Sequence, residues 1–159
     1  MNSPDFEQKV CPPEDLVRRC ASLARPLVFT NGVFDILHRG HVTYLAQARA
    51  LGAAMVLALN SDGSVRRLGK GDDRPINTLE DRLAVVAALA SVDLVTWFKE
   101  DTPISVIEQV QPDILVKGGD WPVERIVGNT LVLARGGSVH SIPFEHERST
   151  TALLRRIRT

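Results

Sequence analysis

Two histidines three residues apart are the side chains in this sequence best placed to do chemistry. His38 and His41 end the stretch Thr30-Asn-Gly-Val-Phe-Asp-Ile-Leu-His-Arg-Gly-His, which follows a short apolar run and leads into a helical pattern. A helix N-terminus offers unpaired backbone N–H groups and the positive end of the helix dipole, which suit phosphate oxygens. Imidazoles add donors where negative charge develops at phosphorus. The pattern therefore predicts a phosphate-binding site.

Other uses of the two histidines are open on spacing alone. Either could be a packing residue, and His-x-x-His also suits a transition metal. No Cys, third His or Glu at a typical offset completes a metal site, so we expect none here. The neighbouring glycines fit phosphate binding, because Gly32 permits a sharp turn after the strand and Gly40 keeps a side chain away from an approaching phosphate.

Four other segments carry candidate residues, each with an ordinary alternative. The glycine-rich segment around Lys70 could hold only a solvated cation, and Lys117 to Trp121 could be a simple turn. Ser149 could be a routine helix N-cap. Arg82 is either an exposed helix cation beside Glu80 or a phosphate contact, and its helix alone does not decide between them.

The apolar pattern predicts alternating strands and helices. We expect strands at 27–30, 54–59, 94–97, 114–116 and 139–142, and helices at 14–24, 40–51, 79–90, 103–110, 129–135 and 149–157. Residues 61–77 are expected to be a mobile surface loop. This order indicates an α/β fold, a Rossmann-like, doubly wound, five-stranded parallel sheet flanked by helices. Ligands of such sheets bind at the carboxyl ends of the strands.

Length and composition favour a single cytoplasmic domain. The 159 residues suit one domain at 14–159 behind a loose arm at 1–13. Nineteen Lys and Arg balance nineteen Asp and Glu, so no overall field would attract nucleic acid or a membrane, and we expect neither as a partner. The two cysteines form neither a disulfide nor a zinc pattern. The start lacks a signal-peptide pattern, and the longest apolar run, Leu83 to Ala90, is too short to span a bilayer.

The stretch from Thr30 to His41 resembles the H-x-G-H signature of the cytidylyltransferase-like nucleotidyltransferase superfamily, in the form found in bacterial sugar-phosphate adenylyltransferases. The stretches Arg74-Pro-Ile-Asn-Thr-Leu-Glu-Asp-Arg, Val116-Lys-Gly-Gly-Asp-Trp and Glu147-Arg-Ser-Thr-Thr follow in the family's order and near its spacing. The likeness covers roughly Glu14 to Ile157. It is greatest to the heptose 1-phosphate adenylyltransferases, which in many bacteria are fused to a kinase that this sequence lacks.

The resemblance implies an activity and a set of roles. AMP would pass from ATP, with Mg²⁺, to D-glycero-β-D-manno-heptose 1-phosphate, giving pyrophosphate and ADP-heptose for lipopolysaccharide core biosynthesis. The catalytic residues would be His38, His41 and Lys70. Besides both histidines, the nucleotide would contact Thr30, Asn31, Gly32, Phe34, Gly40, Lys117, Gly118, Ser149, Thr150 and Thr151. The acceptor would contact Asp35, Arg74, Gly119, Asp120 and Trp121. A homodimer is expected.

Three other functions are compatible with these motifs. They are a cytidylyltransferase acting on glycerol phosphate or another alcohol phosphate, a pantetheine-phosphate adenylyltransferase, and a nucleotide-binding regulator without turnover. Phe-Glu-His-Glu-Arg148 stands where the cytidylyltransferase branch has Arg-Thr-Glu-Gly-Ile, and T-N-G replaces its common G-T-F start. Whether Arg148 replaces the earlier arginine is open. The intact histidine pair argues against the regulator.

Overall fold

The chain forms a parallel α/β sheet with helices on both faces. In the computed structural model, which describes residues 4–146 and 149–159, five parallel strands pair in the order β3-β2-β1-β4-β5. The strands are β1 (Leu27–Gly32), β2 (Ala54–Asn60), β3 (Leu94–Phe98), β4 (Ile114–Gly118) and β5 (Ser138–Ile142). The chain winds outward from β1 in both directions, so the order reverses between β1 and β4. The predicted fold class is confirmed.

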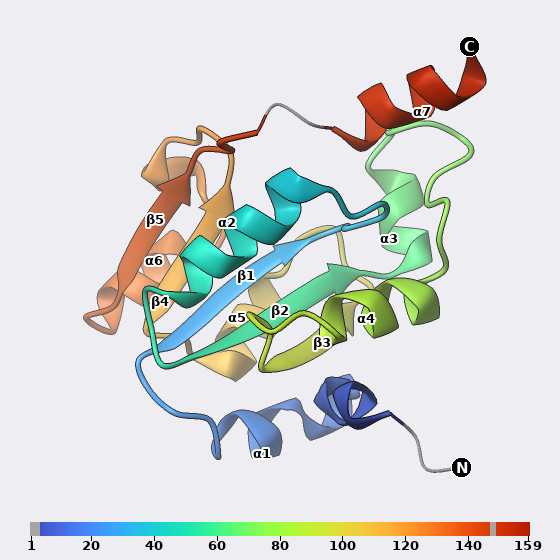
Figure 1. The fold of residues 1–159 in the computed structure, drawn as a ribbon. Helices are drawn as coiled ribbons and strands as arrows, with labels where there is room; N and C mark the ends of the chain where they lie inside the picture. The colour runs from blue at the N-terminus through green and yellow to red at the C-terminus, as the bar shows by residue number, and fades with distance from the viewer. Residues whose placement is uncertain (1–3, 147–148) are drawn as a thin grey trace.

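Alternate side chains of the central strands enter two separate cores. In β1, Leu27 and Phe29 pack on one face with α1 (Leu16–Cys20), α5 (Ile104–Val110) and α6 (Asn129–Ala134). On the other face, Val28 packs in a core that includes α2 (Arg39–Arg49) and α4 (Leu79–Ala87). Figure 1 shows α2 and α4 in front of the sheet and α5 and α6 behind it. The near-continuous apolar runs in the sequence reflect burial of these strands on both faces.

The helices follow the predicted order, with shorter boundaries at several ends. The helix expected at 14–24 is the turn η2 (Pro13–Asp15) followed by α1, and the helix expected at 79–90 stops at Ala87. The chain also forms the short helix η3 (Val123–Arg125) and the terminal helix α7 (Thr150–Arg158). Within the described ranges, no helix combines the length and hydrophobicity that a membrane crossing requires.

The first residues that the structure describes pack against the domain, unlike the loose arm expected from the sequence. The short helix η1 (Asp5–Lys9) contacts α4. The Cys11 N–H donates to the Val95 carbonyl at 2.8 Å, and the Cys11 side chain is buried in the core. Pro12 and Pro13 favour an irregular segment, but the apolar Val10 and Cys11 before them pair with or pack against the edge strand of the sheet and hold the chain there.

The segment at 61–77 is not wholly a loop, which corrects the sequence-based prediction. Helix α3 (Asp62–Arg67) begins it, and the Ser61 hydroxyl accepts the Ser64 N–H at 3.2 Å as an N-cap. A Ser N-cap followed by Asp in the first turn is a recognisable helix start. The signal was missed because the helix is short and mostly polar, with Val65 as its buried apolar side chain.

Candidate active site

A cavity lies at the carboxyl ends of the central strands, where the strand order reverses. Its volume is about 450 Å³. Ligands of doubly wound sheets bind at this position because the chains leave neighbouring strands in opposite directions and leave a crevice between them. The lining residues come from the end of β1 and the turn after it, from α2, from the end of β4, from the segments that follow α3 and β5, and from the start of α7; they are Asn31, Gly32, Val33, Phe34, Asp35, His38, His41, Tyr44, Lys70, Arg74, Lys117, Gly118, Phe144, Ser149, Thr150 and Thr151.

Most of the predicted site residues meet at this cavity, and five do not line it. Thr30 is buried beneath it, where its hydroxyl shares a hydrogen bond with the Tyr44 hydroxyl. Gly40 is buried in the first turn of α2; a Cβ there would lie 3.0 Å from the His38 ring and 3.2 Å from the His146 carbonyl oxygen. Gly40 therefore leaves space for the His38 ring. The other three are Gly119, Asp120 and Trp121.

These last three residues turn away from the cavity toward β5. The Trp121 N–H donates to the Ser141 hydroxyl at 2.9 Å, and that hydroxyl donates to the Gly119 carbonyl. Gly119 has φ +108°, a conformation that favours glycine. Asp120 is exposed, and Trp121 is half-exposed. Their role in acceptor binding stays a prediction.

The two histidines are stacked at the start of α2. His38 is the N-cap residue, with extended backbone, and His41 lies in the first turn. Their ring centroids are 3.8 Å apart at an interplanar angle of 22°. Phe34 packs at 5.1 Å from the His41 ring, and Phe144 meets that ring edge-on at 6.5 Å. These contacts fix the direction in which both imidazoles face the cavity.

The turn after β1 is shaped around Phe34. This residue has φ +48°, which is uncommon for a side chain other than glycine, asparagine or aspartate. A Cβ on Gly32 would lie 2.6 Å from Phe34 Cε2, so the ring occupies the space over the glycine. The strained backbone thus directs an aromatic ring between the end of β1 and the His41 imidazole.

His41 is held in its neutral form. Burial lowers its pKa from 6.5 to about 4, assisted by the nearby His38 and Lys70, while a hydrogen bond with the Ile36 backbone opposes the change. At neutral pH the ring is uncharged, and it donates one N–H. An anionic ligand in the cavity would favour the protonated form and reverse part of this shift.

We expect this shift to make stability depend on pH. In the unfolded chain His41 binds a proton near pH 6.5, but in the folded protein only near pH 4. Protonation between these values favours unfolding, so stability is full above about pH 6.5 and is lost as pH falls toward 4. The free energy of unfolding, measured by chemical denaturation, should be lower at pH 5 than at pH 7, and His41 should account for roughly 1 to 2 kcal/mol of that difference. The variant His41→Gln should lose that part of the slope; an unchanged slope would contradict the assignment.

Two lysine side chains line the cavity together with the histidines. Lys70 comes from the segment after α3, and Lys117 is the residue before the last in β4. Desolvation lowers the pKa of each lysine, with a further decrease from Arg74 at Lys70 and from Lys70 at Lys117. These positive groups repel one another when no anion lies between them. The arrangement therefore favours a polyanionic ligand such as a triphosphate.

The arrangement does not form a protein-held metal site. In the residues described, no three His, Cys, Asp or Glu side chains come together as a metal-binding group. Asp35 lines the cavity, but its carboxylate accepts hydrogen bonds from Arg74 and from the Ile76 and Asn77 N–H groups.

The start of α7 also lines the cavity. The Ser149 hydroxyl accepts the Ala152 N–H at 3.0 Å, and the Thr150 hydroxyl donates to the Ile36 carbonyl at 3.4 Å. Backbone N–H groups of this first turn are suited to phosphate oxygens. Glu147 and Arg148 lie outside the described residues, so the expectation about Arg148 is not tested.

Val33, Tyr44 and Phe144 also line the cavity, although they were not among the predicted site residues. Tyr44 was interpreted only as part of a helix, yet its hydroxyl reaches both Thr30 and the Val116 carbonyl and bridges β1 and β4. Phe144 follows β5 in an irregular segment, where no periodicity could mark it. Tyr44 could have been noticed as the single tyrosine on an otherwise aliphatic helix face.

Arg82 fits neither of the two sequence-based interpretations. Its side chain is 0% exposed. Its guanidinium donates to the Val33 and Asn60 carbonyls at 2.9 Å and pairs with Asp62 at 2.7 Å. Arg82 therefore binds the ends of β1 and β2 together below the cavity and does not line it.

Comparison with known proteins shows the family to which the chain belongs. The model of the cytidylyltransferase-like family matches residues 29–156. The chain is 57% identical to a D-beta-D-heptose 1-phosphate adenylyltransferase of Bordetella bronchiseptica, over 99% of each protein. It is also 57% identical to the bifunctional protein HldE of Shewanella amazonensis, but it spans 27% of that protein's length. The crystal structure of a lipopolysaccharide core biosynthesis protein from Thermoplasma volcanium is 30% identical, with a TM-score of 0.61 over 77% of this chain and 98% of that one. The protein is a member of the cytidylyltransferase-like family of nucleotidyltransferases.

Proposed function

We propose that this protein transfers AMP from ATP to D-glycero-β-D-manno-heptose 1-phosphate, releasing pyrophosphate and forming ADP-heptose for the lipopolysaccharide core. The observation that carries the reaction class is one cavity that brings together two stacked histidines, two lysines and a helix N-terminus. The choice of ATP and of the heptose acceptor is supported by the relative with that activity, which matches this chain from end to end.

The reaction that we propose is one in-line displacement at the α-phosphorus. An oxygen of the sugar phosphate forms a bond to the α-phosphorus, and the bond from that phosphorus to the bridging oxygen of the β-phosphate breaks. The electron pair leaves with pyrophosphate. The attacking oxygen is already ionised at neutral pH, so the protein needs no strong general base. Positioning and charge stabilisation then account for catalysis.

The described residues suit these two tasks. His38 and His41 can donate hydrogen bonds to phosphate oxygens, with His41 neutral before the nucleotide binds. Lys70 and Lys117 can offset the charge that moves onto pyrophosphate. Magnesium bound to the triphosphate would reduce its charge further. We assign Ser149, Thr150 and Thr151, at the start of α7, to binding the phosphates.

The test is a substrate panel. Purified protein with Mg²⁺ is given each of the four ribonucleoside triphosphates with D-glycero-D-manno-heptose 1-phosphate, and pyrophosphate release and the sugar nucleotide are measured. We expect ATP to be strongly preferred. Turnover of CTP with glycerol 3-phosphate, and none with the heptose phosphate, would move the protein to the cytidylyltransferase branch. No turnover with any acceptor, pantetheine phosphate included, would contradict an enzymatic role. We also expect a homodimer by light scattering.

A further inference from the structure

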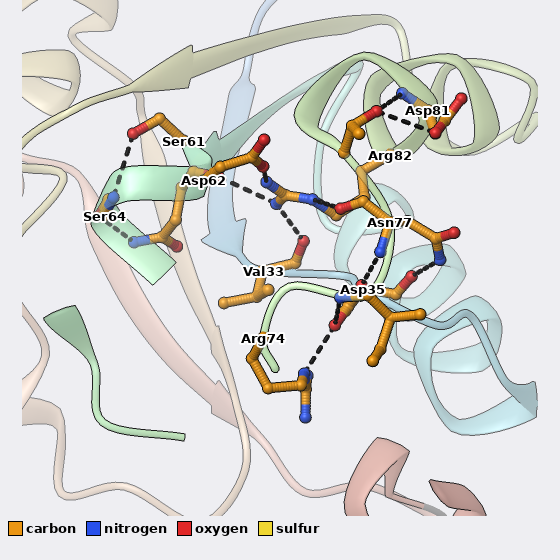
Figure 2. A network of polar contacts seen from close by, with 12 residues as sticks. Val33, Asp35, Ser61, Asp62, Ser64, Arg74, Asn77, Asp81 and Arg82 are labelled. Atoms are coloured by element: carbon orange, nitrogen blue, oxygen red, sulfur yellow. Dashed lines mark hydrogen bonds and ion pairs between the residues drawn. The ribbon is translucent and has the colours of Figure 1, made fainter. Parts of the chain in front are cut away.

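The carboxylate of Asp35 is fully committed to contacts within the protein. Its side chain is 0% exposed and pairs with Arg74, whose side chain is 6% exposed. Asp35 Oδ2 accepts Arg74 Nε at 2.7 Å and the Ile76 N–H at 2.9 Å, and Oδ1 accepts the Asn77 N–H at 2.8 Å. Asn77 Nδ2 in turn donates to the Asp35 backbone carbonyl, as Figure 2 shows. Both carboxylate oxygens therefore hold residues 74–77.

These contacts join two parts of the site that are far apart in sequence. Asp35 lies in the turn that leads to His38, and residues 74–77 end the segment that carries Lys70. Lys70 and both histidines line the same cavity. No described residue accepts a hydrogen bond from the Lys70 ammonium, so its position depends on how its segment is held.

Arg82 anchors the same segment at its base. Arg82 donates to the carbonyl of Asn60, which precedes the segment at 61–77, and to the carbonyl of Asn77, which ends that segment. It also binds the Val33 carbonyl, in the turn after β1. Arg82 thus fixes where the segment leaves and rejoins the domain (Figure 2). The Asp35 contacts are closer to Lys70 and attach the segment directly to the histidine turn.

We infer that Asp35 is a positioning residue, which fixes the Lys70 segment against the histidine turn so that Lys70 and the histidines act on the same phosphates. This inference rests on the proposed nucleotidyl transfer and replaces the expectation that Asp35 contacts the acceptor. A buried carboxylate whose oxygens are all engaged is a poor ligand for a sugar hydroxyl, because binding would require it to release donors it already holds.

The first test compares Asp35→Asn with a matched control, Asp93→Asn. Asp93 lies before β3, away from the cavity, and it also accepts an Arg Nε, from Arg49 at 2.7 Å, and a backbone N–H, from Met55 at 2.8 Å. We expect Asp35→Asn to lower kcat roughly 10- to 100-fold, as a small misplacement of a catalytic group does. The KM for the sugar phosphate should change less than threefold. Asp93→Asn should leave both constants nearly unchanged.

A double-mutant cycle with Lys70→Ala separates positioning from direct contact. If Asp35 acts by placing Lys70, Asp35→Asn should cost little once Lys70 is absent, so the double variant should be about as slow as Lys70→Ala alone. If Asp35 binds the acceptor, the two losses in kcat/KM should multiply. A multiplicative result would overturn the inference.

Proteolysis measures the same coupling without turnover. Trypsin cleavage after Lys70 reports how firmly the segment is held, and we expect it to be several-fold faster in Asp35→Asn than in the wild type or Asp93→Asn. Unchanged cleavage would overturn the inference. If the wild type transfers no nucleotide, the proposed function is refuted, but the cleavage rates still test whether Asp35 holds the Lys70 segment.

A milder variant guards against misfolding of Asp35→Asn. Asn77→Ala removes the hydrogen bond to the Asp35 carbonyl but leaves the buried ion pair intact. It should show the same two effects at lower amplitude, with kcat reduced by roughly 3- to 10-fold and faster cleavage after Lys70. Wild-type kinetics and cleavage in Asn77→Ala would count against positioning by Asp35.

Discussion

Replacing His41 with alanine is expected to lower kcat for nucleotidyl transfer about 10²- to 10³-fold, with a smaller change in the KM for ATP. The imidazole faces the cavity between Phe34 and His38, and it is fixed there by ring contacts on both sides. A preorganised donor contributes most where charge develops in the transition state, and loss of one such donor typically costs this much. Steady-state measurement of pyrophosphate release, with the heptose phosphate saturating, checks the prediction.

Two controls limit what that loss can mean. The variant His41→Gln keeps a donor but not the ring, so it should recover only part of the rate. His140 lies in β5, outside the cavity, and its ring shares a hydrogen bond with the Ser138 hydroxyl. The variant His140→Ala should therefore keep nearly full activity. An equal fall in both histidine-to-alanine variants would point to general destabilisation. Wild-type kcat in His41→Ala would refute a catalytic role for this imidazole.

Replacing Arg82 with methionine is expected to lower the free energy of unfolding by about 3 to 5 kcal/mol. Methionine fills similar space, but the carbonyls of Val33, Asn60 and Asn77 would lose their donor inside the protein. Each buried acceptor left without a partner costs about 1 to 3 kcal/mol. For a domain of this size the melting temperature should fall by roughly 6 to 20 °C. Denaturant titration and calorimetry measure both quantities.

Arg49→Met is a matched control for this prediction. Arg49 also pairs with a carboxylate, that of Asp93, and donates to the carbonyls of Gly52 and Ala53. Its side chain is 30% exposed, against 0% for Arg82, so water can replace the lost contacts. We expect a destabilisation of about 1 kcal/mol or less. If Arg49→Met and Arg82→Met lowered the free energy of unfolding equally, burial would not explain the effect of replacing Arg82.

The fold and much of the site could be predicted because their signals are local. The apolar runs at β1 and β2 fix buried strands, and the position of His38 and His41 directly after β1 fixes them at the carboxyl edge of the sheet. Parallel strands separated by helices then require the carboxyl end of β4 to reach the same edge, which places Lys117 at the same cavity. Each step needed only short-range pattern and the rules of βαβ connection.

The features that were missed depend on contacts between distant parts of the chain. Arg82 looks like an ordinary surface cation on its helix, because only the fold shows that three backbone carbonyls converge on it. Asp35 looks like a candidate ligand until Arg74 and the following N–H groups are seen to occupy its oxygens. Phe144 enters the site through an irregular segment, which leaves no periodic signal. Residue type was readable from the sequence at each position, but the partner was not.

The contact between Gly32 and Phe34 constrains the order in which this turn could change during evolution. With the ring in place, any side chain at position 32 would begin 2.6 Å from Phe34 Cε2. With the ring absent, a larger residue at 32 is no longer obstructed, and glycine at 34 would relieve the unfavourable φ of +48°. The two positions are therefore epistatic: substitution at 34 must precede substitution at 32, and a lineage that has filled position 32 cannot easily regain the aromatic ring.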